Sequence, residues 1–190
     1  MSLLSNRIFA SVLALGLASS AALAAKTFTV DPVHSNLVFK VQHLGVSNNW
    51  GRVNDPTGSF TIGDDGLPSF NIEAKTAAID TANAQRDDHL RGPDWFDAKQ
   101  FPTMSFKSTS AKKIDDNTFE VVGDFTLKGV TKPITVELKK VGEGKDPWGK
   151  YRAGYETSFT IKRSDYGVAA MPGGIGEDVT IWVNIEGVQE

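Results

Sequence analysis

Three histidines are the side chains in this sequence best suited to acid–base or metal chemistry. His34 and His43 lie close together in the chain, and His89 lies much further along it. Three imidazoles that converge on one point can bind zinc. The spacings of these three fit no recurring zinc motif, and they fall on separate predicted elements. A zinc site, or an enzyme that uses these histidines, is therefore the weaker interpretation of the sequence.

A hydrolase triad is the second chemistry that the sequence offers, through Asp31, His34 and Ser35. A working triad depends on an assembled geometry with an oxyanion hole, and in some folds on a sharp turn that carries the nucleophile. Three residues that are local in sequence give neither feature. Asp31 and Ser35 are better suited to satisfying backbone groups in a turn. We therefore predict no catalytic residue, no metal ligand and no enzyme activity.

Composition narrows the function classes further. The 190-residue chain has 20 Lys and Arg against 23 Asp and Glu, a formal net charge of −3, and it has no cysteine. A nucleic-acid partner would require a basic stripe, and the sequence shows none. Without cysteine, thiol redox chemistry and thiolate zinc sites are excluded. Stability must come from the burial of apolar groups, with no help from disulfides.

The first residues have the three parts of a secretory signal. Arg7 precedes an apolar run over residues 8–18, and small residues stand at Ala22 and Ala24. This pattern predicts a cleavable signal peptide over residues 1–24. The apolar run is shorter than the roughly 20 residues that a membrane-spanning helix needs. We expect the remaining residues, 25–190, to fold as one exported domain.

The stretch that carries His34 and His43 alternates between apolar and polar residues. Leu37, Phe39 and Val41 share one side with His43, because side chains alternate along a strand. Similar alternation predicts further strands over residues 26–31, 58–62, 70–76, 104–108, 119–127, 134–139, 155–162 and 179–185. The segments 44–57 and 142–150, which are rich in turn residues, predict loops.

One segment, residues 81–102, interrupts the strand pattern. Residues 81–91 contain good helix formers, with Thr81 or Asn83 as the N-cap, and Gly92 with Pro93 ends the predicted helix. Residues 94–102 predict a compact turn rich in aromatic side chains. Because this insert departs from the strand pattern, we expect it to act as a lid.

These elements predict an all-β protein. About eight strands have one apolar face and one polar face, and tight turns join most of them. A sandwich and a closed barrel both bury such strands. The strand lengths and the single short helical insert favour an eight-stranded antiparallel barrel. Such a barrel is filled by its own side chains or holds one slender ligand.

The inward-facing apolar residues allow two interpretations. They either line a tunnel for an apolar ligand or form an ordinary packed core, and periodicity alone favours the core. The candidate tunnel residues are Phe39, Val41, Phe60, Ile72, Phe106, Phe125, Phe159 and Ile181.

Several motifs, in order along the chain, resemble those of the YceI-like family of bacterial periplasmic proteins. The resemblance rests on residues 31–35 (DPVHS), 43–45 (HLG), 85–91 (QRDDHLR), 96–97 (FD), 101–102 (FP), 106–108 (FKS), 123–133 (GDFTLKGVTKP), 146–149 (DPWG), 152–154 (RAG) and 186–189 (EGVQ). It covers the whole chain after the signal peptide. Trp95 and Tyr166 depart mildly from the family pattern, and both positions remain aromatic.

The resemblance implies a lipocalin-like barrel over residues 25–190, located in the periplasm. It implies a carrier that holds a long-chain isoprenoid lipid, such as a quinone or a prenyl phosphate, with no established catalytic activity and no obligatory cofactor. It favours the tunnel over the packed core. Transient contact with the membrane or with membrane proteins, and pairing of two copies, are compatible with such a role. A structural or stress-response module with a filled barrel stays open as the alternative.

Polar and aromatic residues near the predicted mouth would then contact the lipid head group. The residues that we expect there are His43, Arg86, His89, Trp95 and Phe96. Arg86 and His89 share one helix face, and aromatic side chains with polar tips suit a pocket mouth. The structural alternatives are a hydrogen-bonded His43 at a strand end and Arg86 paired with a nearby aspartate. We expect Trp95 at the rim, where its loss would leave the barrel folded.

Overall fold

The computed structural model describes residues 24–190 of the chain. The predicted signal peptide, residues 1–24, lies outside the described residues except for its last one. Within residues 24–190, no helix has both the length and the apolar character that crossing a membrane requires.

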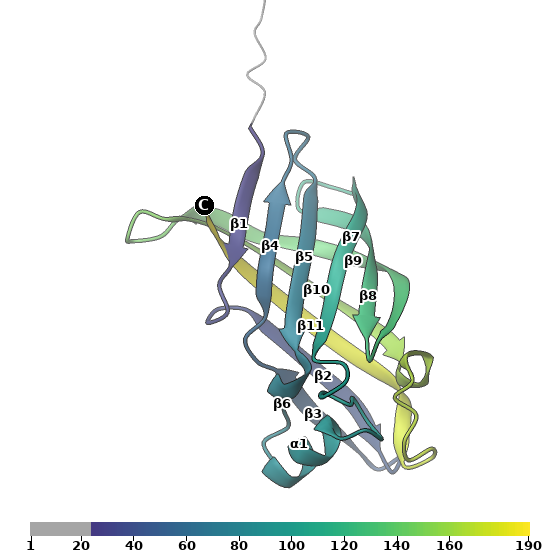
Figure 1. The fold of residues 1–190 in the computed structure, drawn as a ribbon. Coiled ribbons are helices and arrows are strands. Elements are labelled where there is room, and N and C mark those ends of the chain that lie inside the picture. The colour runs from purple at the N-terminus through teal and green to yellow at the C-terminus, as the bar shows by residue number, and fades with distance from the viewer. Residues whose placement is uncertain (1–23) are drawn as a thin grey trace, which may run out of the picture.

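Strands make up most of the described chain (Figure 1). They are β1 (Lys26–Val30), β2 (Asn36–His43), β3 (Ser47–Val53), β4 (Thr57–Ile62), β5 (Pro68–Lys75), β6 (Ile79–Asp80), β7 (Thr103–Lys113), β8 (Thr118–Leu127), β9 (Val130–Lys145), β10 (Tyr151–Lys162) and β11 (Ile175–Gln189). The helical elements are η1 (Thr76–Ala78), α1 (Ala84–Arg91) and η2 (Arg163–Tyr166).

Eight of the strands close into a barrel. They follow one another in the order β1, β4, β5, β7, β8, β9, β10 and β11, and β11 pairs back onto β1. The pairings around this ring are antiparallel. The predicted all-β, eight-stranded antiparallel barrel with a short helical insert is confirmed.

The other three strands extend the walls at one end. β1 continues into β2 after residues 31–35, β3 continues into β4 after residues 54–56, and β5 continues into β6 through η1. β11 therefore pairs with β1 near its C-terminus and with β2 from Ile175 to Asn184. We call the end with β1 and β4 the closed end, and the end with β2, β3 and β6 the insert end.

The insert, residues 81–102, covers the insert end, where β6 pairs with β3 alone among the described strands. α1 begins after Asn83, whose side chain accepts a hydrogen bond from the Arg86 backbone at 2.9 Å. Arg91 at the end of α1 donates to the carbonyls of Ala77 and Ile79, at 2.8 and 2.9 Å. The Arg91 side chain therefore ties the end of α1 to η1 and to β6.

Parts of two segments that the sequence predicts as loops are strands instead. β3 lies within the predicted loop 44–57, and β9 continues to Lys145, inside the predicted loop 142–150. The Asn and Gly residues of these segments have weak strand preference. Pairing supplies the missing stabilisation, because β3 lies between β2 and β6 and the end of β9 pairs with β10. The loop predictions are therefore wrong over Ser47–Val53 and over residues 142–145, where tertiary pairing overrides local preference.

Packed aromatic rings fill the closed end. Phe28 stacks on Phe60 with 4.9 Å between ring centroids, and Tyr155 meets Phe60 edge-on at 5.5 Å. Phe70 contacts the same tyrosine edge-on at 5.4 Å. Stacked and edge-to-face contacts of this kind add to the stabilisation from burial. A second buried cluster at the insert end consists of Trp95, Leu127, Ile161, Tyr166 and Val168.

Candidate functional site

An apolar cavity occupies the middle of the barrel, and residues of both clusters line it. Its volume is about 190 Å³. The strands contribute mainly Val, Leu, Ile and Phe side chains, and the insert contributes Leu90, Trp95 and Phe96. The chemistry of this wall suits an apolar ligand, because it offers almost no polar group to the interior.

Several rings that point into the barrel remain partly exposed. Four of these are only half-buried, namely Phe39, Phe106, Phe125 and Phe159. Side chains in a packed core are almost completely covered, as Phe60 is at 1% exposure. The partial exposure of the four rings therefore comes from the cavity that they face. The middle of the barrel is hollow.

Two glycines leave room for rings that line the cavity. Gly51 on β3 pairs with Phe39 on β2, and a Cβ atom at Gly51 would overlap the Phe39 ring. Gly123 lies against the Phe106 ring in the same way. Because each glycine has no side chain, the ring occupies the space that a Cβ atom would fill at the wall. These two glycines help to keep the cavity open.

Arg163 places a buried positive charge in the cavity wall, where it is 3% exposed. Its guanidinium donates to backbone carbonyls, at 2.7 to 2.9 Å, of Val168, Ala170, Ile175 and Gly176. Glu177 lies 3.4 Å away, and the guanidinium carbon lies 6.0 Å from the centroid of the Trp95 ring. Arg163 therefore holds the loop between η2 and β11 in place and faces an indole ring.

Sequence reasoning missed Arg163, although a signal was present. Arg163 continues the inward phase of Phe159 and Ile161, which both line the cavity. A charged residue in an inward phase is unusual, because charged side chains are rarely buried without partners. The partners here are backbone carbonyls of a loop, which the sequence pattern does not reveal.

Six of the eight predicted tunnel residues line the cavity. These are Phe39, Ile72, Phe106, Phe125, Phe159 and Ile181. Phe60 does not line it, because this ring belongs to the aromatic packing of the closed end. Val41 does not line it either, because it lies further toward the β2–β3 turn, opposite Asn49. The predicted tunnel positions of Phe60 and Val41 are wrong, and ligand contact by the other six stays a prediction.

The five predicted mouth residues are divided by the structure. Trp95 and Phe96 line the cavity, whereas His43, Arg86 and His89 do not. Arg86 donates to the Thr81 hydroxyl and to the Thr81 carbonyl, both at 2.7 Å. The Thr81 N–H in turn donates to Asp87 at 2.9 Å. Arg86 therefore anchors the start of the insert, with Thr81 as its partner in place of the expected aspartate.

Trp95 is buried and does not lie at the rim. It is 7% exposed, and its Nε1 donates to Nε2 of the exposed His89 at 3.3 Å. The insert folds back onto the barrel and carries this indole into the buried cluster of the insert end. The predicted rim position of Trp95 is therefore wrong. His43 lies at the end of β2, half-buried, opposite Ser47 and Ile175.

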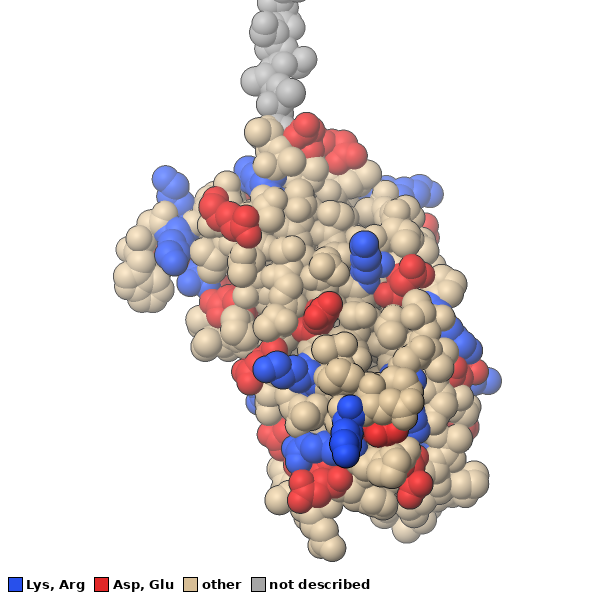
Figure 2. All heavy atoms as spheres, viewed as in Figure 1, with Lys and Arg blue, Asp and Glu red and all other residues tan. Residues whose placement is uncertain are grey.

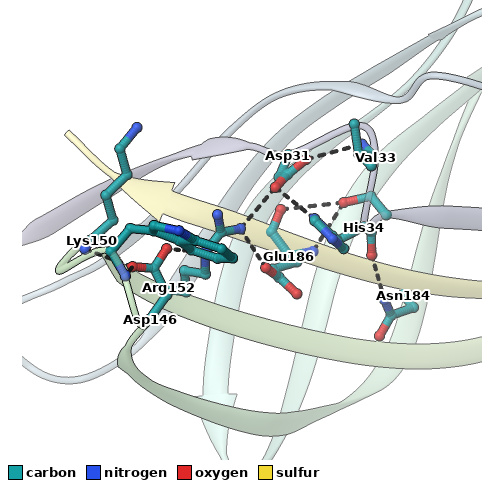
Figure 3. A network of polar contacts seen from close by, with 10 residues as sticks. Asp31, Val33, His34, Asp146, Lys150, Arg152, Asn184 and Glu186 are labelled. Atoms are coloured by element: carbon teal, nitrogen blue, oxygen red, sulfur yellow. Dashed lines mark hydrogen bonds and ion pairs between the residues drawn. The ribbon is translucent and has the colours of Figure 1, made fainter.

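A polar network joins three chain segments beside the junction between β1 and β2 (Figure 3). The guanidinium of Arg152 contacts carboxylates of Asp146 at 2.8 Å, Asp31 at 2.8 Å and Glu186 at 2.7 Å. Nδ1 of His34 lies 2.8 Å from the Asp31 carboxylate. We call these five residues the seam network, because they tie the turn after β1 to β10 and β11.

The seam network contains a three-residue group, Asp31, His34 and Glu186, whose ligand atoms converge as metal ligands do. Arg152 donates to both carboxylates and already supplies the positive charge that a metal ion would bring. The His34 hydrogen bond, opposed by burial and reinforced by Arg152, lowers the pKa of Asp31 to about 2. The pKa of Asp146 is lowered chiefly by its hydrogen bond from Arg152. The group is therefore an ion-pair network around an arginine.

Neither of the two sites considered from the sequence, the three-histidine metal site and the hydrolase triad, is assembled among the described residues. His34, His43 and His89 form no converging group among the described residues. Ser35 is 3% exposed, donates to the Glu186 carbonyl at 3.2 Å and accepts a hydrogen bond from the Glu186 N–H at 3.0 Å. The hydroxyl of Ser35 therefore satisfies backbone groups, as expected of a turn residue, and is not placed as a nucleophile.

A closed antiparallel barrel around an apolar cavity places the protein in the lipocalin-like class by architecture. The comparison with protein families is more specific, because the model of the YceI-like domain matches residues 28–187. The chain therefore belongs to the YceI-like family.

Curated relatives support this membership. A UPF0312 protein of Yersinia pestis (strain Pestoides F) is 42% identical over 159 residues, which cover 82% of this chain and 82% of that protein. A UPF0312 protein of Photorhabdus laumondii is 42% identical over 176 residues, which cover 91% of each.

Solved structures share the fold. The YceI protein of Campylobacter jejuni matches with a TM-score of 0.71 at 28% identity, over 78% of this chain and 90% of that chain. BcnA of Burkholderia cenocepacia matches with a TM-score of 0.75 at 21% identity, over 83% and 98%. A polyisoprenoid binding domain from Saccharophagus degradans, implicated in plant cell wall breakdown, matches at 0.66 with 14% identity, over 86% and 98%. The last two likenesses show the fold alone.

Proposed function

We propose that this protein is a carrier that binds a long-chain isoprenoid lipid inside its barrel. The observation that carries the proposal is the apolar cavity, whose wall keeps four phenylalanine rings half-buried. The side chains around an empty apolar cavity lack packing contacts on that side, and an apolar ligand would supply them. The YceI-like fold supports the proposal, since one protein of this fold is named a polyisoprenoid binding domain. The same support favours a binding protein over an enzyme.

The size of the cavity limits how much of a tail it encloses. An apolar protein cavity of about 150 Å³ holds one benzene ring, which has six carbon atoms. By that standard the 190 Å³ observed here encloses roughly one to two five-carbon isoprene units. A longer tail requires the half-buried rings to move. Phe39 and Phe106 are placed for such movement, because each has the cavity on one side.

The hydrophobic effect alone gives the tail little preference for the barrel over a membrane. Burying one methylene group is worth about 0.8 kcal/mol relative to water. A tail in a bilayer is already out of water, so its transfer into the barrel is close to neutral. Shape and head-group contacts must then decide whether the protein loads or unloads. This balance suits a carrier, which has to release its cargo.

We place the head group at the insert end, near Arg163 and Trp95. The Arg163 guanidinium already donates to backbone carbonyls, so it would attract carbonyl or phosphate oxygens through its positive charge and not through a free N–H. The Trp95 indole offers a flat apolar surface beside it. A quinone and a prenyl phosphate both have this chemistry. His43, Arg86 and His89 are not required for this arrangement, because they do not line the cavity.

The proposal includes export to the periplasm through the signal peptide expected over residues 1–24, and no obligatory cofactor beyond the lipid cargo. A structural or stress-response module with a filled barrel has less support, because the described barrel is hollow.

Organic extraction of the purified protein, followed by mass spectrometry, tests the proposal. We expect a long-chain isoprenoid lipid in the extract. Delipidated protein should also take up a quinone or a prenyl phosphate from vesicles that contain it. If the extract holds no such lipid and the delipidated protein takes up none, the carrier function is refuted.

Gly51→Ala tests whether the cavity itself is the binding site. The new methyl group would overlap the Phe39 ring and push it into the cavity, so we expect lipid uptake to fall. Gly142→Ala is the matched control, because a Cβ atom at Gly142 meets nothing within 4 Å. Equal uptake by both variants, with circular dichroism showing both folded, would place the lipid elsewhere.

A further inference from the structure

We propose that the insert end docks on a lipid bilayer through a tip patch formed by Leu44, Val46 and Met171. Leu44 and Val46 lie in the turn between β2 and β3, and Met171 lies in the loop between η2 and β11. The Leu44 N–H donates to the Gly174 carbonyl at 2.7 Å, which joins the two tips. This proposal goes beyond cargo binding and rests on the proposed function for its purpose, since an isoprenoid carrier must meet a membrane.

The three side chains of the tip patch are exposed. The exposed fraction is 56% for Leu44, 81% for Val46 and 51% for Met171. In Figure 2, the lower right corner of the molecule, where these tips lie, is mostly tan with few charged side chains. Single apolar residues on a surface are ordinary. Three on adjoining tips at one end of a barrel form a contact surface.

The backbone conformation of the β2–β3 turn does not favour a leucine at position 44. Leu44 has φ of 51° and Gly45 has φ of 69°, and the Val46 N–H donates to the His43 carbonyl at 3.1 Å. Two successive positive φ values in such a turn are typical of type I′, which favours Asn followed by Gly. A large apolar residue in the left-handed region is disfavoured by its side chain.

Met171 repeats this feature, with φ of 51°. The other described non-glycine residues with positive φ are Asp55, Ala82, Asp97 and Lys128. The two large apolar members of the set therefore both occur in the tip patch. At each position a small polar residue would fit the backbone better, so the apolar side chain serves something outside the fold.

An aromatic band lies behind the tips on the outer face of the barrel. Trp50 is 53% exposed and stacks on Trp182 with 5.2 Å between ring centroids. Nζ of Lys40 lies 5.8 and 5.5 Å from the two rings. Trp50 follows Val46 by roughly 13 Å along an extended strand. Apolar groups of interfacial proteins reach about 5–10 Å into a bilayer, and Trp and Lys side chains favour the head-group level above.

The segments that carry the tips also form the cavity wall. Phe39 lines the cavity on the strand that ends before Leu44, and Val168 lines it in the loop that carries Met171. A bilayer at the tips therefore touches the segments next to the cargo site. This continuity favours a membrane as the occupant over a second copy of the chain.

Charge indicates an apolar contact with no need for acidic lipid. On β10 and β11, Lys162 pairs across the strands with Asp178, next to Glu177. Charges of both signs therefore lie beside the tips. We expect binding to neutral phosphatidylcholine vesicles, with little gain from phosphatidylglycerol and little loss at high salt.

Vesicle co-sedimentation with a triple variant, Leu44→Asn, Val46→Ser and Met171→Asn, tests the proposal. Asn tolerates the left-handed region, so the barrel should stay folded and its Tm should be unchanged or raised. We expect vesicle binding to weaken roughly tenfold for each apolar side chain removed. The matched control is Val141→Ser with Trp148→Ser, two exposed apolar residues near the far end of the barrel, which should bind vesicles like the parent.

The experiment tests membrane docking by the tip patch independently of lipid binding inside the barrel. Lipid retention is measured on the same proteins by extraction, so loss of docking with retained lipid supports the tip patch alone. The proposal is overturned if the parent does not bind phosphatidylcholine vesicles, or if parent and triple variant bind them equally. A parent that is dimeric by light scattering, becomes monomeric in the triple variant and binds no vesicles would assign the tip patch to a second copy.

Discussion

Phe60 and Phe125 are both phenylalanines on the inward face of a strand, but their surroundings differ. Both point into the barrel, and strand alternation treats them alike. Phe60 is 1% exposed among the rings of the closed end. Phe125 lines the cavity, half-buried, with Phe159 at 5.8 Å and Tyr166 at 5.4 Å between ring centroids. The first ring is part of a packed core, and the second is part of a wall.

Truncation of the two rings should therefore affect stability differently. We expect Phe60→Ala to lower the free energy of unfolding by about 3–5 kcal/mol, as for a fully packed aromatic residue. Phe125→Ala should lower it by less, because the ring already borders an empty volume and forms fewer contacts. Urea denaturation of both variants measures the difference. Equal losses would show that the cavity is filled around Phe125.

The seam network makes a prediction about acid stability. The pKa of Asp31 in the folded protein is about 2, below its ordinary value of 3.8. A lowered pKa contributes stability above the ordinary value, and this contribution is lost as the pH falls through the folded value. The parent should therefore be more stable than Asp31→Asn above about pH 4, and the difference should shrink between about pH 4 and pH 2. Denaturant titrations across this range measure it.

A suitable control is Asp64→Asn, which changes an exposed carboxylate in the β4–β5 turn. Its stability should follow that of the parent across the same range. A difference between parent and Asp31→Asn that does not change with pH would contradict the role given to the Asp31 carboxylate.

At the scale of elements, Lys128 fastens the insert to the barrel. It lies in the β8–β9 turn, and its Nζ donates to the Pro93 carbonyl at 3.2 Å and to the Gly167 carbonyl at 3.1 Å. Pro93 belongs to the insert, and Gly167 follows η2. One side chain thus joins three segments at the insert end.

Lys128→Met should loosen the insert while leaving the strands intact. We expect faster transfer of a fluorescent isoprenoid between vesicles and protein, with only a small change in Tm, because exposed charged contacts add little stability. Lys113→Met, in the β7–β8 hairpin, is the control and should transfer lipid at the parent rate. An unchanged rate in Lys128→Met would mean that lipid enters by another route.

Sequence patterns predicted the elements that depend on local periodicity. The alternation along β2, β8 and β10 identified the inward faces. Of the two caps considered, Thr81 and Asn83, the structure has Asn83, so α1 begins at Ala84 and not at Thr81, and it ends before Gly92 as predicted. β3 was missed, because Asn and Gly residues are poor strand formers and its pairing partners lie elsewhere in the chain. Periodicity also could not show where along the barrel the interior is filled. That depends on which inward side chains meet across the barrel, as the rings of Phe60 and Tyr155 do at the closed end.

The same limit applied to the site. Trp95 and Phe96 were identified as site residues because aromatic side chains in an irregular segment suit a pocket mouth, but the rim position expected for Trp95 was wrong, since this side chain is buried. The partners of Arg86 and Arg163 could not be identified, since backbone atoms of distant or irregular segments accept their hydrogen bonds. Hydrogen bonds of that kind leave no trace in residue spacing.

At the scale of the whole molecule, the cavity volume predicts how affinity depends on tail length. Delipidated protein should bind isoprenoids more tightly with each unit up to about two, by at most about 4 kcal/mol per unit relative to water. Further units should add less, because each must displace a ring from the wall. Titration with isoprenoids of increasing length measures this dependence. An undiminished gain for long tails would show that the cavity lengthens freely.

At the insert end, strands alone do not close the barrel wall, because β6 pairs with β3 alone among the described strands. This affects how the width of the barrel can vary. In a fully closed barrel, the bore is set by the number of strands and their stagger, so a change in bore requires the whole sheet to slip in register. Here the wall beyond β6 is completed by residues 81–102, which contain no strand and are tied to η1 and β6 by the Arg91 side chain. Lengthening or shortening that segment would change the bore at this end while every strand pair stayed in place. The molecule thus separates the part that keeps its shape from the part that can be fitted to a different cargo.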